Sequence, residues 1–120
     1  MKKFHLLLLL FFALESFSQK EANIWYFGQK AGLDFNTNPP TALTNGKIDT
    51  YEGCSSFSDE DGKLLFYSDG ITVWDKNHNI MKYEDGSFAD DLKGDPSSTQ
   101  SGMIIPKPGS ISIYYLLIIV

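Results

Sequence analysis

The sequence contains no arginine, and this absence argues against one broad class of partner. All ten basic residues are lysines, against 15 acidic residues, so the formal net charge is -5 at pH 7. The planar guanidinium fork that binds phosphates and guanine edges is therefore missing, and an acidic surface repels anionic polymers. We expect no nucleic-acid partner.

Cysteine and histidine are almost as scarce. The single cysteine, Cys54, cannot form an internal disulfide, so the fold must be held by packing and backbone pairing. Its alternating surroundings, "EGCSSF", favour a half-buried strand thiol over a nucleophile. His78 is the one histidine outside the first 18 residues, and it lies in an asparagine-flanked turn. We therefore expect no catalytic residue, metal site or cofactor.

Hydrophobic runs are short, and the longest lies at the N-terminus. Residues 6–14, "LLLLLFFAL", form an apolar run of nine that follows Lys2 and Lys3. A transmembrane helix needs about 20 residues, and a buried core helix seldom lies so close to a chain start. Small residues in "SFS", residues 16–18, complete a secretory signal peptide, with no cysteine for lipid attachment. We expect export to the periplasm, cell surface or medium, with contact to the secretion machinery and no transmembrane segment in the mature chain.

The rest of the chain, residues 19–120, reads as one all-β domain. Apolar and aromatic residues recur with a period of two, and Gly, Asn, Asp or Pro interrupts them every eight to twelve residues. The pattern predicts an opening hairpin, a loop, a four-stranded antiparallel meander and a final hairpin. Their ranges are 24–35, 36–46, 54–84 and 101–120.

The two later hairpins resemble each other. Residues 54–67 align with residues 101–114, so that Phe57 matches Ile104 and Gly62 matches Gly109, each pair 47 residues apart. A period of about 40 to 50 residues with four strands is typical of β-propeller blades, although an immunoglobulin-like sandwich has similar spacing. We expect an incomplete propeller-like domain of about two four-stranded blades, with the opening hairpin packed on the meander.

Three longer stretches also resemble a known family. The runs "NIWYFGQKAGLDFN", "EGCSSFSDEDGKLLFYSDGITVWDKNHNIM" and "GDPSSTQSGMIIPKPGS" are similar to the N-terminal region of large secreted surface proteins of Bacteroidetes. Those proteins carry a gliding-motility-associated, type IX secretion (type B) sorting domain at the C-terminus. The resemblance implies a propeller-like domain of a multidomain exoprotein. This sequence has no such sorting domain, and we expect it to be an N-terminal fragment.

Clusters of polar residues offer a few candidate sites. Asp59 and Asp61 precede Gly62 as in a calcium loop, yet too few ligands follow, and acidic residues with glycine also make hairpin turns. The run "GDPSSTQSG" offers groups for a sugar or a protein backbone, or else a loop held by its own hydroxyls. Its candidate ligand-binding residues are Asp95, Ser97, Ser98, Thr99 and Gln100.

The same region raises the question of catalysis. Asp85, Asp90, Asp91 and Asp95 are close in sequence, and paired carboxylates hydrolyse glycosides when one of them has a raised pKa. No apolar pocket is evident around them. We therefore expect a non-enzymatic binding or adhesion module for an extracellular protein or glycan. The alternatives are a propeller-type carbohydrate-processing module and a nonfunctional gene fragment.

The signal peptide leads to a first prediction. Because the small residues at 16 and 18 direct cleavage after Ser18, the exported protein should begin at Gln19. N-terminal sequencing of exported material tests this, and a mature chain that still carries residues 1–18 would contradict it.

Overall fold

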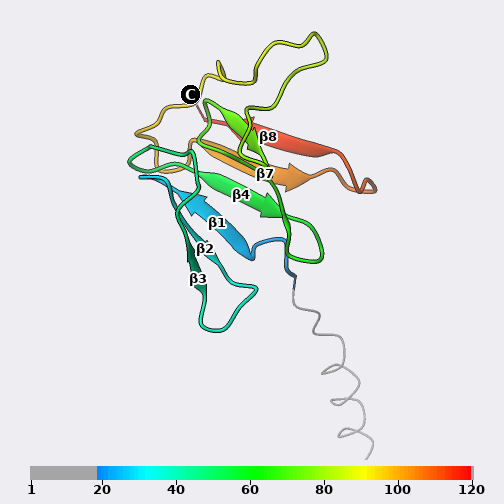
Figure 1. Ribbon diagram of the computed structural model, residues 1–120. Helices are drawn as coiled ribbons and strands as arrows, with labels where there is room; N and C mark the ends of the chain where they lie inside the picture. The colour runs from blue at the N-terminus through cyan, green and yellow to red at the C-terminus, as the bar shows by residue number, and fades with distance from the viewer. Residues whose placement is uncertain (1–18, 120) are drawn as a thin grey trace, which may run out of the picture.

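The computed structural model describes residues 19–119, and all of the regular structure in that range is β. Eight strands form three small antiparallel sheets, so the all-β prediction is confirmed for the described residues (Figure 1). No helix in that range is long and apolar enough to cross a membrane. The predicted signal peptide, residues 1–18, lies outside the described residues.

Sheet 1 is the predicted opening hairpin with an additional strand. The turn between β1 and β2 has a positive φ at both Gln29 and Lys30, as a type I′ turn requires. The third strand lies in the stretch predicted to be a loop, so that prediction was wrong for three residues. The strands are β1 (Ile24–Phe27), β2 (Ala31–Asp34) and β3 (Thr41–Leu43), in the order β1-β2-β3.

Sheet 2 is the predicted meander with one strand fewer. Its strands are β4 (Ser55–Ser58), β5 (Leu64–Ser68) and β6 (Val73–Asp75), and both predicted pairings, β4 with β5 and β5 with β6, are confirmed.

The fourth strand, predicted at residues 80–84, is reduced to isolated bridges at Ile80 and Lys82. Its backbone bonds are divided between two partners: Met81 donates to Val73, whereas Tyr83 donates to Ser87. No continuous ladder forms, and residues 19–119 contain no four-stranded blade.

Sheet 3 is the predicted final hairpin, formed by β7 (Gly102–Pro106) and β8 (Tyr114–Ile118). The matched turn glycines both have a positive φ, 84° at Gly62 and 75° at Gly109. The repeat holds less well afterwards, because its spacing of 47 predicts a strand from residue 111 and β8 begins at Tyr114. The longer connection in the second hairpin shifts the strand.

The three sheets pack in series. The first strands of the sheets follow one another, with β1 against β4 and β4 against β7, so the opening hairpin does pack on the meander (Figure 1). β4 and β7 run in the same direction, and β1 runs opposite to them (Figure 1). The arrangement is open and does not form a closed propeller.

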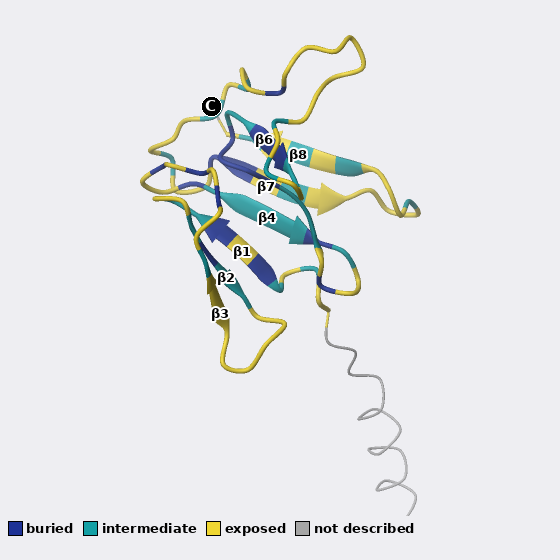
Figure 2. Ribbon diagram, in the orientation of Figure 1, coloured by how far each residue is buried: buried dark blue, intermediate teal, exposed yellow. Residues whose placement is uncertain are grey.

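The core lies between sheets 1 and 2. Tyr67 and Ile48 have no exposed surface, and Tyr67 stacks between Tyr26 and Trp74, with ring centroids 4.7 Å and 5.3 Å away. Trp74 belongs to this cluster and Val73 is also buried, whereas Phe66 is only half-buried and faces sheet 3. Figure 2 shows that burial is concentrated in β1, β6 and the inner part of sheet 2.

The packing of this core predicts that two tyrosines differ sharply in their contribution to the free energy of unfolding. Tyr67→Ala removes a fully buried ring and leaves a cavity, so the free energy of unfolding should fall by about 3–5 kcal/mol. Tyr51 is 94% exposed, and Tyr51→Ala should change it by less than about 0.5 kcal/mol. Urea unfolding followed by tryptophan fluorescence measures both, and similar values for the two variants would contradict the assigned core.

Candidate functional site

Aspartate carboxylates in this protein close turns. In six turns, one aspartate oxygen (Oδ1) accepts a hydrogen bond from the backbone N–H two residues later, at 2.8–3.0 Å. Such Asx turns satisfy backbone donors that a short loop would otherwise expose. The six aspartates are Asp34, Asp59, Asp69, Asp75, Asp85 and Asp95.

Two of these turns contain candidate catalytic carboxylates. Asp85 accepts bonds from both the N–H and the hydroxyl of Ser87, and Asp95 is held in the same way by Ser97. The side-chain hydrogen bonds from these serines lower the pKa of each carboxyl. A general acid for glycoside hydrolysis needs the opposite shift, a raised pKa. Asp90 and Asp91 are exposed, and neither carboxylate lines the apolar groove to which their neighbours Ala89 and Leu92 contribute.

The carboxylates of Asp59 and Asp61 are also engaged within a turn, which argues against a calcium loop. Asp59 Oδ1 accepts from the backbone N–H groups of Asp61 and Lys63, and Asp61 forms an exposed ion pair with the Lys63 ammonium at 3.4 Å. Both carboxylates therefore serve the turn between β4 and β5. The described residues contain no group of three or more potential metal ligands.

The predicted binding loop is partly closed on itself. Asp95 and Ser97 bond to each other, and the Thr99 hydroxyl donates to Glu52 at 3.1 Å. Thr99 and Gln100 are exposed, and Ser98 is half-buried. Asp95 and Ser97 are also exposed, but their side chains are engaged with each other.

His78 lies in a network that sequence reasoning missed. The Asn45 amide donates to Nε2 at 2.8 Å, so neutral His78 carries its proton on Nδ1 and donates it to the Tyr67 hydroxyl at 2.9 Å. The Tyr26 hydroxyl donates to Asn45 at 2.8 Å. Both ring nitrogens are therefore engaged. The backbone of His78 has a φ of 65°, and its imidazole links this turn to the aromatic core. This arrangement is structural and leaves no free base.

Cys54 is half-buried just before β4, and burial raises the pKa of its thiol. A raised pKa reduces the thiolate fraction that nucleophilic chemistry requires. The expectation of an unreactive structural cysteine remains consistent with these surroundings.

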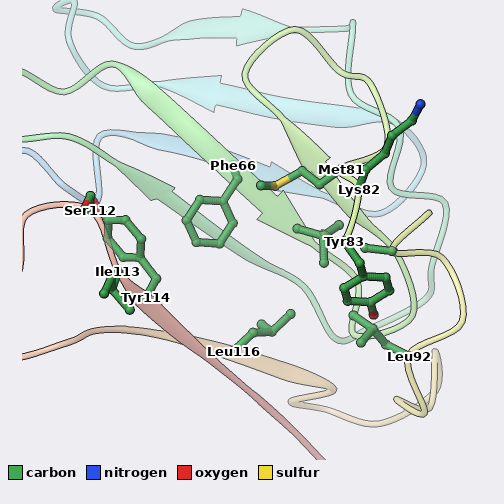
Figure 3. A pocket seen from close by; sticks show the side chains of 11 residues that line it. Phe66, Met81, Lys82, Tyr83, Leu92, Ser112, Ile113, Tyr114 and Leu116 are labelled. Atoms are coloured by element: carbon green, nitrogen blue, oxygen red, sulfur yellow. The ribbon is translucent and has the colours of Figure 1, made fainter. Parts of the chain in front are cut away.

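An apolar groove lies between sheets 2 and 3. It has a volume of about 450 Å³, and Figure 3 shows Phe66, Tyr83 and Leu92 facing Tyr114 and Leu116 across it, with the Lys82 ammonium directed away. Its lining residues are Phe66, Val73, Met81, Lys82, Tyr83, Ala89, Leu92, Ser112, Ile113, Tyr114 and Leu116. An apolar lining with few polar groups suits an apolar side chain far better than a sugar.

Comparison with known proteins found no match to a family model, to a curated protein or to a solved structure. The assignment of function therefore depends on the chemistry of these surfaces.

The buried tyrosines predict a loss of stability at high pH. Burial, opposed by a backbone hydrogen bond from Lys47, raises the pKa of Tyr67 from 10.0 to about 12, and burial also raises that of Tyr26. The folded state therefore keeps these protons where the unfolded chain has lost them. The contribution of these protonated tyrosines to the free energy of unfolding should be fully present below about pH 10, and it should be lost as the pH rises towards 12.

Urea unfolding across this pH range measures the effect. Tyr67→Phe should reduce the slope of the free energy of unfolding against pH, and Tyr51→Phe should leave it unchanged because that ring is exposed. An equal slope in wild type and Tyr67→Phe would contradict the assignment.

Proposed function

We propose that this chain is a non-enzymatic binding or adhesion module of an exported surface protein. The carrying observation is the combination of carboxylates held in turns with an apolar groove at a sheet boundary. Carboxylates with lowered pKa values support binding rather than acid catalysis. The signal-like N-terminus and the resemblance to gliding-motility-associated exoproteins support the location.

The arrangement of the sheets supports a propeller-like origin for the module. Sheets 2 and 3 each start with an inner strand, β4 or β7, and these strands run in the same direction (Figure 1). Successive propeller blades have this relation. In this proposal sheets 2 and 3 are two incomplete blades, and sheet 1 packs against sheet 2 through β1 and β4.

A protein partner fits the groove better than a glycan does. Glycan recognition requires several polar groups around a ring face, whereas the groove presents mainly aromatic and aliphatic carbon. The exposed Thr99 and Gln100 provide a separate polar contact surface on the 95–100 loop. We propose that the groove provides most of the binding energy and the loop adds specificity.

The proposal is tested by screening the purified chain against a glycan array, an array of extracellular peptides and a panel of chromogenic glycosides. Peptide binding without turnover of any glycoside is the expected result. The double variant Thr99→Ala, Gln100→Ala should weaken binding several-fold. Asp61→Ala, in the β4–β5 turn, is the control and should not change binding. Full replacement of the loop is unsuitable, because Ser101 is buried and donates to the Asp69 carbonyl at 2.6 Å.

Turnover of a glycoside that is lost in Asp90→Asn or Asp91→Asn would overturn the proposal in favour of an enzyme. Binding to glycans alone would reject a protein partner. Repeating the peptide array with the Thr99→Ala, Gln100→Ala variant distinguishes binding at the loop from binding at the groove.

A further inference from the structure

The outer edge of β8 has backbone groups without a strand partner among the described residues. In the β7–β8 hairpin, Lys107 donates to Ile113 and Ile119 donates to Ser101, so the odd-numbered residues of the second strand bond to the first. Hydrogen bonding alternates along antiparallel strands. The N–H and C=O groups of Tyr114, Leu116 and Ile118 therefore point away from β7.

The apolar groove lies beside this edge. The side chains of Tyr114 and Leu116 line it, and its far wall comes from Phe66 of β5 and from the segment that follows β6 (Figure 3). In sheet 2 the corresponding position is filled, because β6 pairs with the outer edge of β5. Sheet 3 has no third strand in the described residues, and the groove occupies the space that the inward side chains of such a strand would fill.

We propose that β8 binds an extended segment of a partner polypeptide by strand addition, with alternate apolar side chains of that segment inserted in the groove. Main-chain hydrogen bonds to an open edge provide affinity, and pockets for alternate side chains provide specificity. The inference rests on the proposed binding function and names its partner class. Met81, Tyr83 and Leu92 line the same groove as the β8 side chains, so the space beside this edge is bounded on its far side. A single extended segment therefore fits there better than a second copy of the chain.

A synthetic peptide of alternating Thr and Val, about ten residues long with a Lys at each end, is the probe, since natural strands seldom exceed that length. Fluorescence anisotropy of the labelled peptide with the full chain should show saturable binding. A Thr and Ser peptide of equal length should bind at least about tenfold more weakly, because its side chains gain little from the groove.

Backbone methylation distinguishes strand addition from simple side-chain binding. N-methylation of alternate residues on the edge that faces β8 should abolish binding, and N-methylation of the intervening residues should leave it intact. If both methylated peptides bind equally well, or neither peptide set binds at all, the proposal is overturned.

Protein variants provide the matched controls. Met81→Asp puts a charge in the groove and should weaken binding about tenfold or more, whereas Ile111→Asp, at a 98% exposed loop position, should have no effect. Ile118→Pro removes one outward N–H without touching the β7 ladder and should also weaken binding. Circular dichroism confirms that each variant is folded.

Two other outcomes give a clear decision. A stable dimer that excludes the peptide would assign the edge to a second copy and overturn the proposal. Binding on the peptide array that persists in Met81→Asp would also overturn it, while leaving the wider binding function in place.

Discussion

The stack of Tyr67 between Tyr26 and Trp74 is the contact on which the rest of the structure depends. It joins sheet 1 to sheet 2 in a chain that has few fully buried side chains. Aromatic rings bury a large area for each residue, so a small number of them compensates for short strands and the lack of disulfides. Around this stack, the turn that carries His78 and the segment that carries Asn45 are fixed by hydrogen bonds to the tyrosine hydroxyls.

Sheet 3 is held by a different and smaller set of contacts. The Tyr114 ring packs on Phe57 and Phe66 of sheet 2, with centroids 5.2 Å and 5.3 Å away. The opposite face of the hairpin exposes a row of apolar residues. These residues are Met103, Ile105, Tyr115, Leu117 and Ile119. The molecule is thus most firmly packed at sheets 1 and 2 and least covered at sheet 3, where the proposed binding edge lies.

Local pattern was enough to predict most of the strands and their pairing. Alternation and turn residues specify β4, β5 and β6, because each is short and bounded by Asp, Asn or Gly. β3 was missed since its three residues lie between two turn-rich stretches. A strand was wrongly predicted at residues 80–84. The backbone bonds of this segment are divided between two neighbouring segments, and this division depends on tertiary packing that the local pattern does not show.

The candidate site was harder to predict than the fold. The groove joins residues of β5, β8 and the segment that follows β6, and no local signal connects these parts of the sequence. The link from Asn45 to His78 spans 33 residues in the same way. The turn aspartates, in contrast, follow from short-range chemistry, and the hydrogen bonds of Asp59 agree with the preference for a turn over a calcium loop there.

The glycine at the turn between β5 and β6 limits how closely neighbouring segments of the chain can pack. At Gly70, φ is 85°, and a Cβ there would lie 2.6 Å from the Ser101 carbonyl oxygen, while the Gly70 carbonyl accepts a bond from Gly94. Three chain segments thus meet at one point that has no room for a side chain. Any side chain at position 70 would push the Ser101 backbone away, so the close packing of the segment that leads into sheet 3 on the β5–β6 turn depends on this single glycine.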